Sequence, residues 1–516
     1  MLRGILTVGG WTMASRLLGF IRDILIAALV GAGPVADAFF VANRLPNLFR
    51  RLFGEGALNA AFVPAFSALL TRDGSDSARS FAEETLSIMV FWLLALTLLC
   101  LIAMPVIMLG FAPGFSDEPA KFALTVELAR IAFPYMPLIC LAALLSGILN
   151  GLDRFAAAAA APVLYNLVSI ACMLWLVPYV PTPGHALAWG VSLSGVVQLA
   201  LLLAAIRRAG MRITLPRPRL TPRIRTLLRR MAPGVLGAGI TQINMSVDVI
   251  IATLLPAGTA SVLYYADRLN QLPLAVIGIA IGTALLPQLS RAVANAESDP
   301  TAPHRTLNQA ITYALVLTLP AALALVAVGA PIVDVLFRRG AFDAATVTLT
   351  AQALAAYAAG LPAFVLVKVL TPAFFARGDT AMPVRIALGC IALNLALNVA
   401  LMSPLQHMGP PLASSLSAWA NVAALAIVLL RRGNMTADRP LLLAIARMLA
   451  AAALMLAALW WLHRTAYAPL AADPLWRWAG LAMLVGGGMA AYALAAAALG
   501  ILDARRLLGR LRGRKD

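Results

Sequence analysis

The sequence predicts an all-α polytopic membrane protein with about fourteen transmembrane helices, in two pseudo-symmetric six-helix bundles plus two extra C-terminal helices. Three observations support this class. Of the 516 residues, 61% are hydrophobic and only 12% are charged, which is too few charges for a soluble protein of this length. Long apolar runs recur from end to end, and landmarks of the first half recur in the second.

The apolar runs are each about 20 residues or longer, enough to cross a bilayer as a helix. We expect the first run to be a retained helix and not a signal peptide, because Arg16 interrupts it and it outlasts a signal core. The runs lie near residues 5–31, 34–70, 81–110, 120–149, 156–178, 184–206, 231–255, 259–289, 306–336, 344–371, 382–402, 410–430, 441–462 and 476–501.

Arginine placement predicts the orientation, because cytoplasmic loops are enriched in Lys and Arg. The connection 207–230 holds nine arginines, and more arginines follow the twelfth run and fill the C-terminal tail. Connections on the opposite side, such as 178–186, are nearly uncharged. Both termini are therefore expected in the cytoplasm.

The expected domain organisation follows from the runs and from a duplication. It comprises an N-terminal six-helix half (1–208), a basic cytoplasmic linker (209–230), a C-terminal six-helix half (231–432), and two additional helices with a basic tail (433–516). Halves with an even number of helices enter the membrane the same way round, as in transporters that open a central cavity to either side. The alternative is chance, because the repeat rests on three landmark pairs. These are Leu45-Pro46 with Leu272-Pro273, Pro137 with Pro362, and Asp153 with Asp379, at spacings of 227, 225 and 226 residues.

Charged side chains at membrane depth need an explanation. Arg16, Arg22 and Arg268 are the least expected, since each charge at a helix centre costs about 2.5–3.5 kcal/mol on insertion scales. Arg16 and Asp23 lie seven residues apart and are expected on one helix face. The charges either form internal ion pairs that lock helices together or bind an anion. Arginine suits a diphosphate, because its planar fork holds phosphate oxygens bidentately and stays charged.

Prolines predict which helices line the cavity. The second run contains Pro46 and Pro64, and the eighth contains Pro273 and Pro287. Proline removes a backbone donor and kinks a helix, and irregular backbone at membrane depth persists only where protein or cavity water satisfies it. We therefore expect the first, second, seventh and eighth runs to surround the central space.

Long motifs of this sequence resemble the MurJ/MviN family of lipid II flippases, in the multidrug/oligosaccharidyl-lipid/polysaccharide exporter superfamily. The motifs are SRLLGFIRD (15–23), ADAFFVANRLPNLFRRLFGEGALNAAFVPAF (36–66) and YYADRLNQLPLAVIGIAIGTALLPQLS (264–290), and the segments 133–150 and 367–384 are similar as well. The resemblance implies export of lipid II, the undecaprenyl-diphosphate-linked disaccharide-pentapeptide, across the bacterial inner membrane by alternating access for cell-wall synthesis. It also implies that the last two helices form a groove for the lipid tail.

The resemblance further implies roles for individual residues. The positions that bind the diphosphate map onto Arg16, Arg22, Arg50, Arg268 and Asn47. The gating or supporting acidic positions map onto Asp23, Asp37, Glu55 and Asp267.

No nucleotide site or catalytic constellation is visible, because no lysine follows a glycine as in a P-loop and the four histidines are scattered. The sequence therefore predicts a transporter and not an enzyme, without a cofactor. An inside-negative potential favours anion export by about 2.3 kcal/mol per charge per 100 mV. Coupling to Na⁺ or another ion stays open, because Asp248, Asn394 and Asn398 offer oxygen ligands; a hydrogen-bonded helix contact is the competing interpretation.

Two other functions remain open at this stage: a flippase for another polyprenyl-diphosphate-linked saccharide, and a multidrug/cation antiporter of the same superfamily, which needs a carboxylate-rich cavity. The net charge of +18 does not indicate nucleic acid, because it does not lie on a folded soluble surface. The expected partners are lipid II and membrane lipids. We expect a monomer that associates with the cell-wall synthesis machinery.

Overall fold

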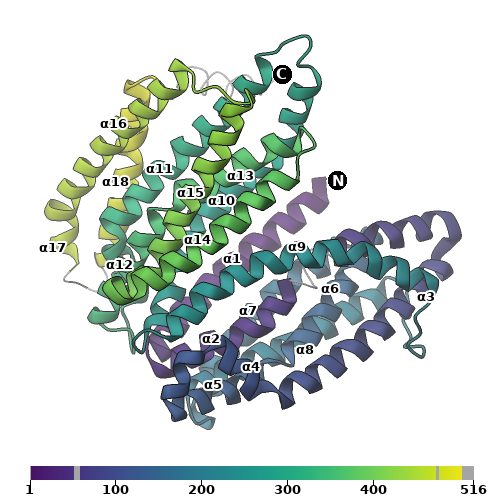
Figure 1. Cartoon of the computed structure of the whole chain (residues 1–516). Coiled ribbons are helices and arrows are strands. Elements are labelled where there is room, and N and C mark those ends of the chain that lie inside the picture. The colour runs from purple at the N-terminus through teal and green to yellow at the C-terminus, as the bar shows by residue number, and fades with distance from the viewer. Residues whose placement is uncertain (1, 52–57, 472, 474–475, 502–516) are drawn as a thin grey trace. The chain divides into compact units, whose positions relative to one another are not determined.

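The computed structural model describes residues 2–51, 58–471, 473 and 476–501, and every regular element within them is a helix (Figure 1). Side chains are described in these ranges except at 2–6, 59–60, 233–241, 243–245, 276 and 278–284. The chain forms two compact units. Unit 1 comprises Met1–Ser261 and Arg339–Phe342, and unit 2 comprises Val262–Arg338 and Asp343–Asp516.

Unit 1 is built from nine α-helices and the start of a tenth, with two short 3₁₀ turns, in the described residues. Its helices are α1 (Leu2–Val30), α2 (Pro34–Phe49), α3 (Leu58–Ile102), α4 (Met104–Phe111), η2 (Pro113–Asp117), α5 (Pro119–Ala132), α6 (Tyr135–Gly151), α7 (Phe155–Trp175), η3 (Val177–Tyr179), α8 (Pro183–Arg208) and α9 (Pro222–Thr253). Helix α10 (Thr259–Ala294) begins in unit 1 and continues into unit 2.

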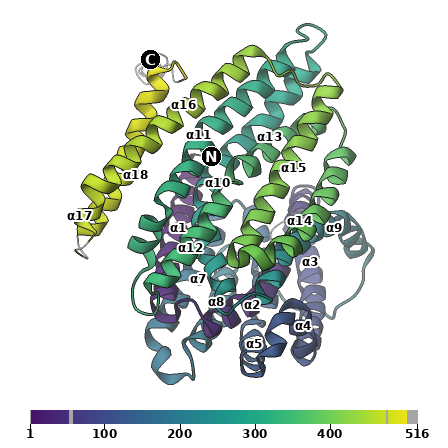
Figure 2. The ribbon, with the colours of Figure 1, turned by 60° about the vertical axis from the view of Figure 1, so that its left-hand side comes forward.

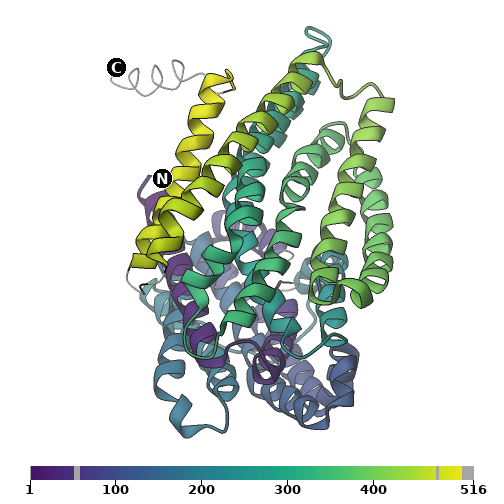
Figure 3. The same cartoon turned by 90° about the vertical axis from the view of Figure 1, so that its left-hand side faces the viewer.

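Unit 2 continues with α11 (Ala302–Phe337), α12 (Ala344–Ala358), α13 (Leu361–Phe375), α14 (Ala381–Leu405), η4 (Gln406–Met408), α15 (Gly409–Arg431), α16 (Arg439–Leu462), η5 (His463–Tyr467), α17 (Ala468–Leu470) and α18 (Trp476–Ala498). Helices α16 and α18 pack against each other and against α11 (Figures 2 and 3). Their shared core includes Val335, Met455 and Leu484. They occupy the region where the sequence predicts two additional helices.

The composition of the helices confirms a polytopic membrane protein. Within the described ranges, nine helical stretches are long and apolar enough to cross a membrane. Large apolar side chains such as Leu98, Ile102 and Val106 are exposed, as expected for surfaces that face hydrocarbon. Some stretches join two predicted runs, as in 381–431, which contains both α14 and α15. The count of about fourteen transmembrane helices therefore stays a prediction.

The second predicted run, 34–70, differs from the structure. Helix α2 ends at Phe49, and α3 runs from Leu58 to Ile102 through the predicted connection between the second and third runs. The backbone of α3 leaves helical geometry at Gly74, with φ 81° and ψ −179°. Glycine reaches this conformation without a Cβ clash, so one residue bends the chain inside an otherwise helical connection.

The prolines of the expected cavity-lining runs lie inside helices that continue on both sides of them. Helix α10 continues from Thr259 to Ala294 through both Pro273 and Pro287. Pro46 and Pro64 likewise lie inside α2 and α3. Each proline still removes one N–H donor, but neighbouring turns maintain the helix around it.

Backbone geometry repeats at the spacing seen in the sequence. Helix α5 ends at Ala132 and α6 begins at Tyr135, while α12 ends at Ala358 and α13 begins at Leu361. Helices α6 and α13 then each end in a turn of the same type, which contains one left-handed residue and one hydrogen bond that spans five residues. The left-handed residues are Asp153 (φ 58°) and Gly378 (φ 76°), and the hydrogen bonds are Arg154 N to Leu149 O and Asp379 N to Phe374 O. The helix boundaries are thus 226 residues apart, and the two turns are 225 residues apart.

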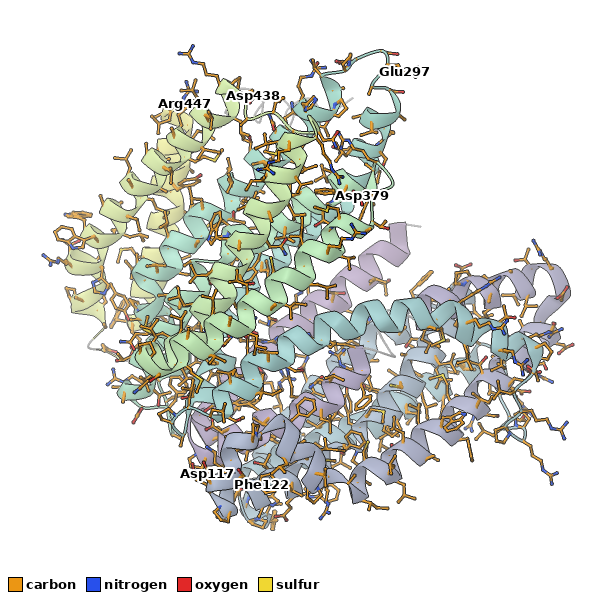
Figure 4. All side chains as sticks on the ribbon, in the orientation of Figure 1. Asp117, Phe122, Glu297, Asp379, Asp438 and Arg447 are labelled. Carbon is orange, nitrogen blue, oxygen red and sulfur yellow. The ribbon has the colours of Figure 1, made fainter. Side chains whose placement is uncertain are left out.

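Three charged connections of unit 2 lie together at one end of that unit, while other charged residues, such as Arg338 and Arg464, lie in its remaining connections. Glu297, Asp379 and Asp438 mark this end, between α10 and α11, α13 and α14, and α15 and α16 (Figure 4). Asp438 caps α16 by accepting from Leu441 N at 3.0 Å. Arg432 and Arg439 belong to the same connection, as the orientation rule predicts for a cytoplasmic end.

A close backbone contact in unit 1 requires glycine. A Cβ at Gly114, in η2, would lie 2.1 Å from Thr253 O at the end of α9. We predict that Gly114→Ala lowers the free energy of unfolding by about 1–3 kcal/mol, because backbone atoms cannot move aside cheaply. Thermal melting in detergent measures the change. Gly110→Ala is the matched control, since nothing lies within 4 Å of its Cβ. Equal melting shifts for the two variants would contradict the contact.

Candidate functional site

Helix α1 is fixed against α7 by a buried amide. Asn166 Nδ2 donates to Ser15 O at 3.0 Å and to Pro162 O at 3.1 Å. The first bond joins residues 151 positions apart, and it occupies a backbone carbonyl in the middle of α1. The section of α1 that carries the charged residues is therefore held in a defined position on unit 1.

Arg22 and Asp23 form a buried ion pair next to an aromatic ring. Arg22 Nη2 lies 2.8 Å and Nε 3.3 Å from Asp23 Oδ1. The Arg22 side chain is 12% exposed, while that of Asp23 is fully buried. The Arg22 guanidinium also lies 5.2 Å from the centre of the Tyr165 ring on α7. Arg22 therefore neutralises Asp23 and has its orientation fixed from two sides.

Arg16 differs from Arg22 in its surroundings. It is exposed, and no hydrogen bond or ion pair engages it within the part of the chain that the structure describes. Arg16 and Asp23 lie on one continuous helix, as expected for residues that share a face, but Asp23 is buried against its neighbour Arg22 while Arg16 is exposed. Arg16 thus presents its guanidinium to the surroundings of unit 1.

The end of α2 positions another predicted arginine. Asn47 Nδ2 donates to Asn43 O at 2.9 Å, which orients the amide so that its oxygen accepts from Arg50 Nε at 3.2 Å. Both Asn47 and Arg50 are half-buried. Asn47 thus serves as a support for Arg50 in this structure. Glu55, predicted as a supporting acid, lies outside the described residues.

Asp37 is the most fully engaged of the predicted acids. Its Oδ2 accepts from Gly258 N at 2.6 Å, and its Oδ1 accepts from Ser261 N at 2.9 Å and from Ser261 Oγ at 2.8 Å. Since α10 begins at Thr259, the carboxylate lies against the N–H groups of the start of that helix, where negative charge is stabilised. Asp37 therefore ties the start of α10 to α2, and the boundary of unit 1 falls directly after Ser261.

Sequence reasoning missed the cation that neutralises Asp37. Lys121 Nζ lies 3.2 Å from Asp37 Oδ2, and both side chains are buried. The same ammonium lies 4.0 Å from the centre of the Phe115 ring and 3.9 Å from Glu118 Oε1. Lys121 is one of only three lysines in the chain, and it lies at the start of an apolar run. This rarity was the one signal available in the sequence.

The predicted residues of the eighth run belong to unit 2. Asp267 accepts from Gln271 Nε2 at 2.5 Å, one helical turn away on α10. Asp267 and Arg268 are both half-buried, and Tyr265 nearby packs against Phe337 with ring centres 5.3 Å apart. Arg268 therefore lies on a part of α10 that is well packed within unit 2.

The predicted cation ligands are distributed over both units. Asn398 Nδ2 donates to Asn394 Oδ1 at 2.8 Å and to Asn394 O at 3.0 Å, and both residues are buried in α14. Asp248 is half-buried on α9, in unit 1. The described residues contain no cluster of three or more His, Cys, Asp or Glu that could hold a metal ion. The cation site stays a prediction.

Comparison with known proteins decides the family. A family model described as "Lipid II flippase MurJ" matches residues 26–471. The chain belongs to the MurJ family. The resemblance seen in the sequence motifs is thereby confirmed, and MurJ motifs extend through both compact units.

A curated relative and two solved structures support this assignment. The "Probable lipid II flippase MurJ" of Rhizobium meliloti (strain 1021) is 46% identical over 458 residues, covering 88% of this chain and 85% of the relative. A structure of lipid II flippase MurJ in an inward closed conformation covers 95% of this chain and 98% of its own, with 22% identity and a TM-score of 0.79. An inward-facing multidrug transporter of the MATE family covers 81% and 93%, with 16% identity and a TM-score of 0.66. The two structures show that the fold is shared.

The Lys121–Asp37 pair provides a test of the MurJ-family site. We predict that Lys121→Met lowers the free energy of unfolding by about 3 kcal/mol, because Asp37 is left buried with its charge uncompensated. Thermal melting in detergent measures the loss, and adding Asp37→Asn should restore part of it. Glu118→Gln is the control, since Glu118 is 54% exposed and an exposed pair contributes at most about 1 kcal/mol. If Lys121→Met cost no more than Glu118→Gln, the buried pair would not hold the site together.

Proposed function

We propose that this protein is a lipid II flippase, which moves the undecaprenyl-diphosphate-linked disaccharide-pentapeptide from the cytoplasmic to the periplasmic leaflet by alternating access. The observation that carries the proposal is the MurJ family match over residues 26–471. Half-buried arginines in a membrane-spanning fold support it, because they suit an anionic group that must pass through a low-dielectric region.

The proposed diphosphate ligands in unit 1 are Arg16, Arg22 and Arg50. Asp23 and Tyr165 hold Arg22, and Asn47 holds Arg50, so two guanidinium groups are oriented before substrate arrives. Asp23 already balances the charge of Arg22. Arg16, which no hydrogen bond or ion pair engages in the described part of the chain, brings positive charge that compensates the incoming diphosphate. Arg268 of unit 2 is the fourth proposed ligand, on the basis of the sequence motif.

Two carboxylates of unit 1, Asp23 and Asp37, argue against a drug-cation antiporter. A cation cavity needs carboxylates that are available to an incoming cation. In this chain Arg22 balances Asp23, and Lys121 balances Asp37. The similarity to MATE transporters concerns the fold, and the chemistry of these positions favours an anionic substrate.

Location and energy supply follow from the same proposal. We place the protein in the bacterial inner membrane with both termini in the cytoplasm, since the arginine-rich connections lie on that side. The membrane potential drives an anion outward, by about 2.3 kcal/mol per charge per 100 mV. We propose that it acts as a transporter without catalytic chemistry, as a monomer that supplies the cell-wall synthesis machinery.

Arginine variants test the substrate site. We predict that Arg16→Ala, Arg22→Ala, Arg50→Ala and Arg268→Ala each slow lipid II transport about ten- to hundred-fold, because each loses a charge-assisted hydrogen bond worth about 1.5–3 kcal/mol. The measurement is the appearance of lipid II on the outer leaflet of proteoliposomes.

Two controls accompany this test. Arg72→Ala removes an exposed arginine of α3 and should leave transport unchanged. Arg22→Ala combined with Asp23→Asn avoids an unpaired buried carboxylate, so a transport loss in a well-folded double variant points to the ligand role of Arg22. Normal transport by all four single variants would refute the proposed site.

A sodium gradient tests the coupling ion. If Asp248 binds sodium, a gradient accelerates lipid II transport by the wild-type protein, and Asp248→Asn keeps the sodium-free rate but loses the acceleration. Asp299→Asn, in the exposed turn between α10 and α11, is the control and should retain it. Equal wild-type rates with and without the gradient would exclude sodium coupling.

A further inference from the structure

A cavity separate from the proposed diphosphate ligands opens in unit 1. Its volume is about 400 Å³, and it lies where α1 and α8 meet the turn between α6 and α7. Leu149, Phe155 and alanines of α7 and α8 form an apolar wall, and Asp153, Arg154 and Arg208 supply the charges. The volume falls within the range of about 300–1,000 Å³ that is typical of ligand sites. An apolar wall beside two arginines suits an amphiphile with an acidic head.

The turn that forms one side of the cavity is well defined. Asp153 adopts a left-handed conformation with φ 58°, which aspartate tolerates better than most residues. Asp153 N donates to Asn150 O at 3.1 Å, and Arg154 N donates to Leu149 O at 2.8 Å. These bonds place Arg154 directly before α7, whose first residues line the cavity. In the described chain, no side chain caps the N–H groups of that first turn.

The equivalent turn of unit 2 shows what this backbone accommodates. There Asp379 takes the position that Arg154 has in unit 1, as the residue after the left-handed one. The Asp379 carboxylate accepts from Met382 N at 3.0 Å and lies 2.6 Å from Arg432 Nη1, at the end of α15. The hydrogen bond from Arg432 lowers the pKa of the Asp379 carboxyl below its usual range. One repeat thus contains its own anion between a helix N-terminus and an arginine.

The first repeat has two cations in this arrangement, and its one lining carboxylate, Asp153, stands at the left-handed position, where unit 2 has Gly378. Arg154 replaces the aspartate, and Arg208 stands at the end of α8, as Arg432 does just after α15. Arg208 also begins the arginine-rich connection that the orientation rule places in the cytoplasm. Basic pockets between helices on this side bind lipid head groups. An anion from outside the protein, attached to apolar chains, then takes the place that the Asp379 carboxylate has in unit 2.

We infer that this cavity binds an anionic glycerophospholipid of the cytoplasmic leaflet, with its phosphate between Arg154 and Arg208. The acyl chains lie along the apolar wall formed by Leu149, Phe155 and the alanines. Asp153 accepts a hydrogen bond from a head-group hydroxyl, which favours phosphatidylglycerol over phosphatidylcholine. The site is separate from the arginines that we assign to the transported diphosphate, and it does not depend on that assignment.

Native mass spectrometry of the full chain tests the inference, with dioleoyl-phosphatidylglycerol titrated in detergent against dioleoyl-phosphatidylcholine. We expect one phosphatidylglycerol to bind preferentially. Arg154→Ala and Arg208→Ala should each weaken it about fivefold, the contribution of one arginine near a membrane surface. Ala157→Leu, which fills the cavity, should abolish the preference while leaving the melting temperature close to that of the wild type.

Arg207→Ala is the matched control, because Arg207 neighbours Arg208 at the end of α8 but does not line the cavity. It should change the affinity less than twofold. An equal effect of Arg207→Ala and Arg208→Ala would show general surface attraction and overturn the inference. Tighter binding of phosphatidylethanolamine or phosphatidylcholine than of phosphatidylglycerol would also overturn the inference. So would displacement of phosphatidylglycerol by an equimolar amount of lipid II. This experiment measures lipid binding and not transport, so a failure of the inference can be told apart from a failure of the proposed function.

Discussion

Buried charge governs this structure, because an ion in a low-dielectric interior persists only with a partner. Asp37 shows the consequence. One carboxylate receives bonds from Gly258 and Ser261 and a contact from Lys121, so it joins α2, α5 and the start of α10. These three parts of the chain are far apart in sequence. The cost of leaving Asp37 unpaired keeps them together, and it sets where unit 1 ends along the chain.

The fold class was predictable because each spanning helix is indicated by the hydropathy of its own segment, without reference to distant parts of the chain. A run such as 410–430 is apolar for about 20 residues, which is sufficient to indicate a spanning helix. The repeated landmarks were also visible, since Pro137 lies near the start of α6 and Pro362 near the start of α13. The kink at Gly74 and the uninterrupted path of α10 through Pro273 were not predictable in this way. Both depend on how the neighbouring helical turns adjust to the glycine or the proline, and amino-acid composition does not show this adjustment.

The candidate site was predictable in residue type but not in pairing. The motifs identify Arg22, Asp23 and Asp37, and helical spacing placed Arg16 and Asp23 on one face without indicating which arginine pairs with Asp23. A guanidinium at the end of a long flexible side chain reaches its sequence neighbour, so position on a helical wheel does not decide the pair. Lys121 was missed because its acid lies 84 residues earlier in the chain. Long-range pairs of this kind require the tertiary structure, as does the bond from Asn166 to the backbone of Ser15.

The repeated turns after α6 and α13 show how one backbone serves two chemistries. The left-handed residue and the bond spanning five residues recur, so the duplication has retained the local geometry. The side chain that follows has diverged from Arg154 to Asp379, which reverses the sign of charge before the next helix. Because the turn is held by backbone bonds, this exchange leaves the helices in place. A duplicated transporter can therefore keep the symmetry that its helix packing requires while its two halves present different charges to the membrane and to solute.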